Sequence, residues 1–246
     1  MITDINQLPA DSESAFVCAD CMDVMHRFPD KYFDLAIVDP PYGINVTGTP
    51  GGGGKASIGG AKPFGKNRGG LAVSPKTYKA FDDSHTPDAA YFSELERVAK
   101  HRIIFGGNYF LEHLGATECI IVWDKKRRGL NFADCEIAWT DFKMPCRIFE
   151  FKWNGMLQGD MKNKEHRIHP TQKPVALYRW LIDRFTKPTD IILDTHVGSA
   201  SSLIAAQALN RRFVGCELDE YYYNQALKRF NAETSQLTMF NLFREI

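Results

Sequence analysis

Residues 35–43 read Leu-Ala-Ile-Val-Asp-Pro-Pro-Tyr-Gly, an apolar run followed at once by an acid, two prolines and an aromatic residue. The apolar run, Leu35 to Val38, has the length of a buried strand. The prolines rule out a helix directly after it and remove two backbone donors, so that the carbonyl groups can face a ligand. Because open α/β sheets bind ligands beyond the carboxyl ends of their strands, this stretch predicts a binding site around Asp39.

The four residues from Asp39 to Tyr42 suit a flat molecule that carries an amino group. The Asp39 carboxylate and the carbonyl oxygen of Pro40 can accept the two N–H hydrogens of that group. The ring of Tyr42 can stack on the face of the molecule, and Pro41 keeps the segment rigid. We therefore treat Asp39, Pro40, Pro41 and Tyr42 as candidate catalytic residues.

Strand-like and helix-like segments alternate along most of the 246 residues. Short apolar runs predict strands, and apolar positions at helical spacing predict helices. The expected strands are 16–19, 35–38, 102–105, 120–123, 190–194 and 212–217, and the main expected helices are 88–100, 173–186, 200–209 and 220–231. This order predicts a single α/β domain, residues 1–246, with a mostly parallel, doubly wound sheet. The alternating segments 135–139 and 147–151 interrupt the rhythm and predict a small antiparallel insert.

The composition sets only broad limits on function. Thirty basic and thirty acidic residues cancel, so any affinity for nucleic acid must come from local patches. No apolar segment approaches the length of a membrane span and the polar N-terminus does not resemble a signal peptide, so we expect a cytoplasmic protein. Cys18 and Cys21 are not followed by a second pair at zinc-site spacing, and we expect no metal.

The last third of the chain carries a second candidate site. The expected strand 190–194 ends in Asp194 and continues through small residues, 195–201, into a helix. Small residues in such a turn let backbone N–H groups approach a ligand, and the start of a helix favours an anion. The next strand ends in Glu217, where an acid suits a ribose diol. The pattern indicates a nucleoside cofactor with a charged tail, and the absence of a G-x-G-x-x-G fingerprint argues against NAD.

Five segments occur in the order found in the permuted group of S-adenosylmethionine-dependent DNA amino-methyltransferases, and the chain resembles that family over most of its length. Asp39 to Tyr42 resembles the catalytic motif, and residues 169–174 resemble the segment before the cofactor strand. Residues 194–199 resemble the glycine-containing cofactor loop, Glu217 the ribose-binding acid, and Asp20 with Cys21 the step near the adenine of the cofactor. The resemblance implies a Rossmann-like methyltransferase fold with S-adenosyl-L-methionine as cofactor. The cofactor-binding residues that it implies are Asp20, Cys21, Asp39, Thr171, Lys173, Asp194, His196, Val197, Gly198, Ser199, Glu217 and Leu218.

Two positions depart from the pattern of this family. His196 stands where the family usually has an aromatic residue, and Ala200 stands where it usually has a second glycine. His196 can keep the packing role of the aromatic residue or add a polar contact to the cofactor. Ala200 suits the loop if its φ is negative, as at a helix start.

The resemblance also implies a reaction. A methyl group would pass by direct in-line displacement to the exocyclic amine of a base that has been flipped out of double-stranded DNA. Asp rather than Ser at position 39 favours N6 of adenine within this family. The alternatives are N4 of cytosine, and a DNA-binding protein in which the methyltransferase fold is vestigial. An active enzyme would serve DNA methylation of the restriction-modification type, with or without a partner nuclease.

Residues 44–81 are rich in glycine and lysine, lack a hydrophobic period and predict a mobile loop. Residues 60–66 match a phosphate-loop pattern, but Asn67 replaces the Ser or Thr that would bind Mg²⁺, which argues against nucleotide hydrolysis. Such a stretch is as often a solvated loop as a ligand site, and its place beside the Asp39 motif favours contact with the DNA backbone. The residues expected to make this contact are Lys55, Lys62, Lys66 and Arg68.

Residues 124–166 are the expected target-recognition insert. They open with Lys125-Lys126-Arg127-Arg128, a run that is more often a solvated face than a base reader, although contact with DNA phosphates is expected here. The insert is short, which indicates a short target sequence or the help of a second subunit in a homodimer.

The C-terminal tail, 235–246, contains Gln236-Leu237-Thr238-Met239-Phe240 after the last expected helix. This peptide resembles the short motif with which bacterial replication proteins dock on the sliding clamp. The simpler alternative is a tail that packs on the core through Leu237 and Phe240.

Overall fold

The computed structural model describes residues 1–9, 13–44, 78–79, 83–128, 133–154 and 157–242, with side chains as far as Ser235. The strands are β1 (Ala15–Cys18), β2 (Phe33–Val38), β3 (Ala99–Phe105), β4 (Ile120–Asp124), β5 (Cys135–Thr140), β6 (Arg147–Glu150), β7 (Trp153–Asn154), β8 (Leu157–Gln158), β9 (Ile191–Asp194) and β10 (Arg212–Glu217). The helices are α1 (Cys21–Met25), α2 (Ala89–Val98), α3 (Val175–Phe185), α4 (Ser201–Ala208) and α5 (Glu220–Leu242), with short 3₁₀ turns η1 (Ile5–Gln7) and η2 (Gly107–Tyr109).

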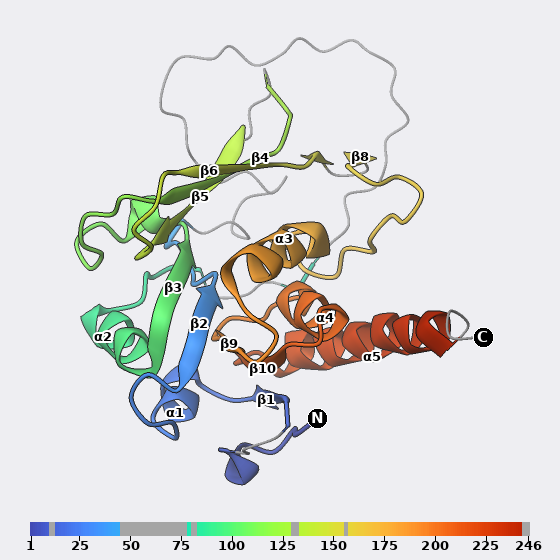
Figure 1. Ribbon diagram of the computed structural model, residues 1–246, viewed down its shortest axis with the longest axis horizontal. Coiled ribbons are helices and arrows are strands. Elements are labelled where there is room, and N and C mark those ends of the chain that lie inside the picture. The colour runs from blue at the N-terminus through green and yellow to red at the C-terminus, as the bar shows by residue number, and fades with distance from the viewer. Residues whose placement is uncertain (10–12, 45–77, 80–82, 129–132, 155–156, 243–246) are drawn as a thin grey trace.

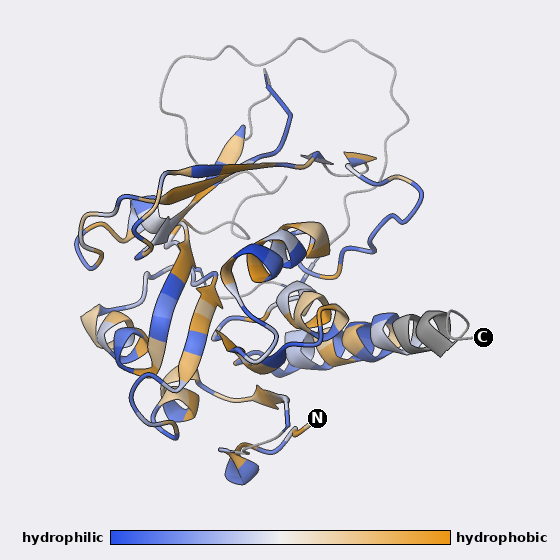
Figure 2. Cartoon of the chain, viewed as in Figure 1, coloured by the Kyte–Doolittle hydropathy of each residue, from blue (hydrophilic) through white to orange (hydrophobic). Residues whose placement is uncertain are grey.

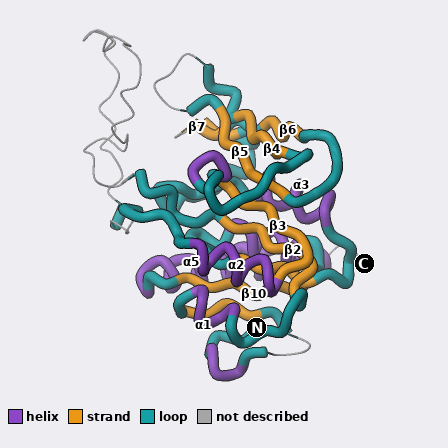
Figure 3. The backbone as a smooth tube through the Cα atoms, turned by 90° about the vertical axis from the view of Figure 1, so that its left-hand side faces the viewer, coloured by secondary structure: helices purple, strands orange, loops and turns teal. Residues whose placement is uncertain are grey.

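One eight-stranded sheet organises the molecule, in the order β1-β10-β9-β2-β3-β5-β4-β6. Figure 3 shows these strands as a twisted ladder that rises from β10 to β6. Five of these strands, β1, β10, β9, β2 and β3, run parallel to one another. The prediction of a mostly parallel sheet is therefore confirmed.

The segment expected as an antiparallel insert instead extends the main sheet. β5 is antiparallel to both β3 and β4, as expected. β6 was expected to be antiparallel as well, and this expectation is wrong, because β6 pairs in parallel with β4. The chain does reverse between β5 and β6, but β4 lies between them and runs in the same direction as β6.

Helices cover both faces of the sheet, with α3, α4 and α5 on one face and α1 and α2 on the other (Figure 1). Alternation along β2 supplies both layers, since Leu35 and Ile37 pack into the first core and Ala36 and Val38 into the second. β2 and β3 carry apolar segments interrupted by hydrophilic ones, whereas the coloured part of α5 mixes polar and apolar residues throughout (Figure 2). The doubly wound arrangement follows from strands that are apolar on both faces.

The expected helices 88–100, 173–186 and 200–209 differ from α2, α3 and α4 by one or two residues at each end, and the last helix differs by more. α2 ends at Val98, because residues 99–105 already form β3. The last helix does not stop at residue 231 but reaches Leu242, so residues 236–240 lie on α5 rather than after it. The side chains of these five residues are outside the described part of the chain, and clamp docking stays a prediction. Among the helices that the structure describes, none has both the length and the apolar character needed to cross a membrane.

Candidate functional site

The carboxyl ends of the parallel strands meet at one edge of the sheet. β9 and β2 lie side by side at its centre, and the chain continues from β9 to β10 on one side but from β2 to β3 on the other. Such a topological switch point is where open α/β sheets bind ligands. A cavity of about 1380 Å³ lies at this edge.

This cavity brings most of the expected site residues together. Those that line it are Asp20, Cys21, Asp39, Pro40, Pro41, Tyr42, Lys125, Arg127, Thr171, Lys173, His196, Val197, Gly198, Ser199, Glu217 and Leu218. Asp194 is different, because it is buried (2 % exposed) and does not line the cavity. The roles of these residues remain predictions, but their common location agrees with a single site.

The Asp39 motif is held in place by hydrogen bonds on both sides. The Tyr42 hydroxyl donates to Asp39 Oδ1 at 2.5 Å. The backbone N–H groups of Tyr42 and Gly43 donate to Asp83 Oδ1 at 2.9 and 3.1 Å. Burial and the neighbouring carboxylate of Asp39 raise the pKa of Tyr42, which keeps its hydroxyl protonated as a donor.

The Tyr42 ring is confined by its surroundings. It stacks on Tyr109 with 4.9 Å between ring centroids and an interplanar angle of 15°. Gly106 has a φ of +70°, and a Cβ added to it would lie 2.3 Å from Cε1 of Tyr42. Only glycine leaves room for the ring at this distance, so the β3–η2 turn fixes the position of Tyr42.

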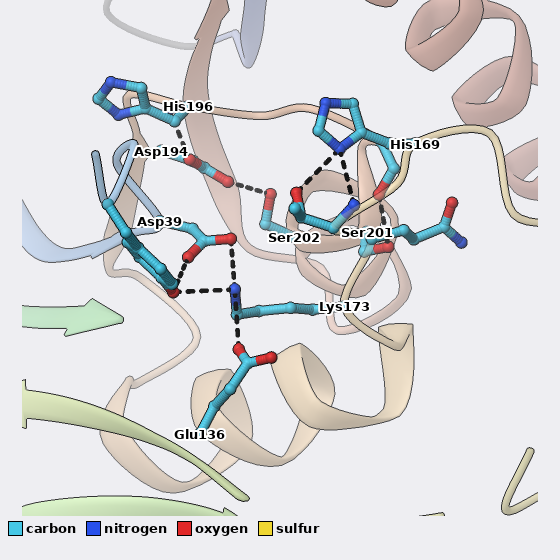
Figure 4. A network of polar contacts seen from close by, with 12 residues as sticks. Asp39, Glu136, His169, Lys173, Asp194, His196, Ser201 and Ser202 are labelled. Atoms are coloured by element: carbon cyan, nitrogen blue, oxygen red, sulfur yellow. Dashed lines mark hydrogen bonds and ion pairs between the residues drawn. The ribbon is translucent and has the colours of Figure 1, made fainter. Parts of the chain in front are cut away.

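A row of alternating charges begins at Asp39 (Figure 4). The buried Lys173 ammonium forms ion pairs with Asp39 Oδ2 and, at 3.2 Å, with Glu136 Oε2. Glu136 Oε1 in turn pairs with Lys125. Lys173 was expected to bind the cofactor; the structure places its ammonium on the carboxylate of Asp39, and its role toward the cofactor stays a prediction.

The loop after β9 contacts the end of β10. The N–H of Gly198, which has a φ of +55°, donates to Glu217 Oε2 at 2.8 Å. Glu217 Oε1 accepts the N–H of Asp219 at 3.0 Å. Burial raises the pKa of Glu217, against these backbone hydrogen bonds. Each carboxylate oxygen keeps a lone pair, so Glu217 can still accept a hydrogen bond from a ligand hydroxyl.

Ala200 takes a conformation that is usual for glycine. Its φ is +63°, so the condition of a negative φ that would make it compatible with the loop is not met. The left-handed conformation costs a non-glycine residue roughly 1–2 kcal/mol. The methyl group of Ala200 is fully buried in the core, and burial of one methyl offsets about 0.8 kcal/mol of that cost.

Two histidines at the site are neutral at physiological pH. Burial lowers the pKa of His196 to about 4 and the pKa of His169 to about 4. His196 lies edge-on to Tyr91 at 5.5 Å and contacts the Thr195 hydroxyl through Nδ1 at 2.9 Å. His196 therefore has a packing role, and a polar contact from it to the cofactor stays a prediction. In the described ranges of the chain, no three His, Cys, Asp or Glu side chains group as a metal site.

The expected DNA-binding residues fall into three groups. Lys55, Lys62, Lys66 and Arg68 lie outside the described residues. Lys126 and Arg128 are at the surface, paired with Glu150 at 2.5 Å and Asp124 at 2.6 Å. Lys125 and Arg127 line the cavity, and burial lowers the pKa of both groups. The run 125–128 therefore divides between the site and the surface.

Sequence reasoning missed Glu136, Tyr109 and Asp83. Glu136 is the second residue of β5, which is antiparallel to β3 and so brings its first residues to the edge where the parallel strands end. An acid among the apolar residues of a central strand was the available signal. Tyr109 ends the short 3₁₀ turn η2 and Asp83 lies in a loop. Neither gave a signal in the sequence, because the position of such connecting segments depends on the tertiary structure.

Asp194 is a buried carboxyl group beneath the loop after β9, and its raised pKa predicts a pH dependence of stability. It accepts hydrogen bonds from the Ser202 hydroxyl and, at 3.0 Å, from the His196 N–H, yet burial raises its pKa to about 7. This pKa lies above the value of 3.8 for an aspartate in the unfolded chain. The contribution of protonated Asp194 to the free energy of unfolding is therefore complete below pH 3.8 and is lost as pH rises through 7.

We therefore expect Asp194→Asn to stabilise the protein at pH 8. Asparagine can keep both hydrogen bonds, with the one to Ser202 reversed, and it has no charge to bury. Relative to the variant, the wild-type free energy of unfolding should fall by about 1.4 kcal/mol per pH unit between pH 5 and 7. Chemical denaturation at several pH values measures this difference, with Asp183→Asn on the exposed face of α3 as control. Parallel pH profiles for wild type and Asp194→Asn would contradict it.

Comparisons with known proteins agree with this site. A family model described as DNA methylase (N6_N4_Mtase) matches residues 116–228. The chain is 26% identical over 235 residues to YubD of Escherichia coli strain K12, a candidate methylase, with 89% of this chain and 91% of YubD covered.

Two solved structures share the fold. The M1.HpyAVI–SAM complex superposes with a TM-score of 0.50 and 20% identity, covering 87% of this chain and 98% of that one. PvuII DNA methyltransferase, described as cytosine-N4-specific, superposes with a TM-score of 0.55 and 12% identity, covering 92% of each chain. The expected Rossmann-like methyltransferase fold is confirmed. The chain is thus similar in sequence to the DNA methylase family model and to YubD, and similar in fold to solved DNA methyltransferases.

Proposed function

We propose that the protein is a site-specific DNA methyltransferase that transfers a methyl group from S-adenosyl-L-methionine to N6 of a flipped adenine. One observation carries this proposal. Residues 39–42, the loop that contains Gly198 and the side chain of Glu217 at the end of β10 all line the same cavity. The match to the DNA methylase model and the SAM complex of M1.HpyAVI support the choice of cofactor.

The residues at the β9 and β10 end fit this cofactor. Gly198 has no side chain to block the approach of a ligand to its backbone, and Glu217 keeps acceptor capacity for a ribose diol. Asp20 and Cys21 lie in the same cavity, where they would contact the adenine ring. When bound, S-adenosyl-L-methionine supplies a methyl group activated by the positive sulfonium.

The Asp39 end provides the groups that an exocyclic amine needs. The lone pair of this amine is delocalised into the base, which makes the nitrogen a poor nucleophile. Acceptance of its hydrogens by Asp39 and the Pro40 carbonyl favours a pyramidal nitrogen with a free lone pair, so that positioning does most of the work. Stacking on the Tyr42–Tyr109 pair offsets part of the few kcal/mol that it costs to unstack the base.

Cytosine N4 is the second candidate acceptor. The fold likeness to the cytosine-N4-specific PvuII enzyme favours it, and Asp rather than Ser at position 39 favours adenine. The two amines differ in the size of their bases, not in the chemistry required of Asp39. The product therefore has to be identified directly.

Incubation with labelled S-adenosyl-L-methionine and unmethylated genomic DNA, followed by mass spectrometry of the nucleosides, tests this proposal. N6-methyladenine is the expected product. N4-methylcytosine would establish the second candidate, and absence of any methylated base would leave a DNA-binding protein with a vestigial fold. Sequencing of the modified sites would identify the target, and sedimentation would test the homodimer.

The proposed contact between the basic residues of 55–68 and the DNA phosphates predicts how DNA binding depends on salt. Replacement of Lys62, Lys66 and Arg68 by glutamine should weaken binding to all DNA sequences alike, because phosphate contacts carry no sequence information. The slope of log affinity against log salt should become shallower by about 0.9 for each phosphate that the variant no longer neutralises. Fluorescence anisotropy at several salt concentrations measures the slope, and an unchanged slope would rule out this contact.

A further inference from the structure

Four charged side chains from distant parts of the chain form one continuous row at the cavity. Asp39 follows β2, Lys125 follows β4, Glu136 lies on β5 and Lys173 precedes α3. Asp39 pairs with Lys173, Lys173 with Glu136, and Glu136 with Lys125. Figure 4 shows Asp39, Lys173 and Glu136 in this order. The charges alternate and cancel, so the row as a whole is neutral.

The two lysines of this row are removed from water. Lys173 is 4 % exposed and Lys125 is 7 % exposed. Burial opposes the charge of Lys173, but the carboxylates of Asp39 and Glu136 outweigh it and raise the pKa of Lys173. Burial likewise opposes the charge of Glu136, but the two lysines lower its pKa to about 2. The two interior members, Lys173 and Glu136, are therefore held charged by their neighbours in the row.

Stability alone gives no reason for this arrangement. Replacing buried ion pairs by apolar residues of similar volume is often neutral or stabilising. The row also ends on the one carboxylate that the reaction requires, and all four residues line the cavity. These facts point to a role in the site rather than in the core.

The hydrogen bonds of Asp39 indicate what this role is. Its Oδ1 accepts from Tyr42 and its Oδ2 accepts from Lys173, so each oxygen keeps one lone pair for a substrate N–H. If no other anion were nearby, the buried ammonium of Lys173 would pair more strongly with the carboxylate of Asp39. Glu136 gives Lys173 a second anion on the side away from Asp39, and Lys125 holds Glu136 in place.

We propose that Glu136 is a positioning residue for methyl transfer, which divides the charge of Lys173 between two carboxylates and so leaves Asp39 free to accept the hydrogens of the target amine. This inference rests on the proposed function. Glu136 acts through Lys173 and does not contact the reacting atoms. Lys125 supports Glu136 from the far side.

The first measurement is the single-turnover rate of methyl transfer by Glu136→Gln. We expect a loss of roughly 10- to 100-fold, which falls within the span of coupling energies between members of one ion-pair network. Affinities for S-adenosyl-L-methionine and for DNA should change less than about threefold, because binding contacts are untouched. Glu136→Asp, which keeps the charge, should recover much of the rate. Lys125→Gln should lower the rate, whereas Lys100→Gln should not, since Lys100 is exposed, pairs with Asp34 at 2.6 Å and does not line the cavity.

A double-mutant cycle separates positioning from a purely structural role. In a Lys173→Met background, Glu136→Gln should cause no further loss of rate, because its effect passes through Lys173. Additive losses, or a loss of rate in Glu136→Gln that follows only a fall in unfolding temperature, would overturn the inference. If Lys173→Met does not fold, the contrast between Glu136→Gln and the charge-conserving Glu136→Asp decides, and equal rates for these two variants would overturn the inference.

The outcome for wild-type protein distinguishes this inference from the function on which it rests. A wild type that binds cofactor and DNA but transfers no methyl group refutes both. An active wild type with an equally active Glu136→Gln variant refutes the positioning role alone.

Discussion

Replacement of Asp39 by alanine should reduce methyl transfer about a thousandfold or more while cofactor binding remains measurable. The change removes the acceptor for the amine and, at the same time, one of the two carboxylates that Lys173 contacts. Gly198 and Glu217, which we propose to contact the cofactor, are held by their own hydrogen bonds and do not depend on Asp39. Calorimetric titration with S-adenosyl-L-methionine and a radiolabel transfer assay measure the two effects.

Asp34→Ala is the matched control for this change. Asp34 lies on the same strand, β2, and pairs with Lys100 at 2.6 Å, but it does not line the cavity. This variant can lose stability and should keep the wild-type rate at a temperature where it is folded. Methylation at the wild-type level by Asp39→Ala would refute the assignment of Asp39 as the catalytic carboxylate.

Gly106→Ala should lower the rate of transfer about 100-fold without a matching change in cofactor affinity. The new Cβ would lie 2.3 Å from the Tyr42 ring, and the φ of +70° adds strain of roughly 1–2 kcal/mol. Tyr42 must therefore move, and with it the hydroxyl that holds Asp39 and the ring that stacks on Tyr109. A displacement of about 1 Å at a reacting group costs on the order of 10²-fold in rate.

Gly115→Ala controls for the loss of a glycine in the same region. A Cβ at Gly115 would meet no atom within 4 Å, and this variant should keep the rate and stability of the wild type. Pre-steady-state transfer rates and thermal unfolding of both variants test the prediction. If Gly106→Ala transferred methyl groups as fast as Gly115→Ala, the position of the Tyr42 ring would not matter for the reaction.

The sequence by itself determined the order of strands and helices and the site at the sheet edge. Apolar runs such as Leu35 to Val38 mark buried strands because burial on both faces demands apolar residues at every position. The chain order then places Asp39 and Glu217 at the carboxyl ends of strands, and parallel strands bring these ends together. Local pattern and chain order were sufficient for these conclusions.

Tertiary structure alone decided how charges and turns meet inside that site. Lys173 and Asp39 are 134 residues apart in the chain, and Glu136 reaches them only because β5 runs against its neighbour β3. The positive φ of Ala200 and the parallel pairing of β6 likewise depend on packing between distant segments. Sequence periodicity indicates which face of a helix or strand is buried. The partners of a buried charge are instead set by the three-dimensional arrangement, because a desolvated ion must be neutralised by an opposite charge that the fold brings close to it.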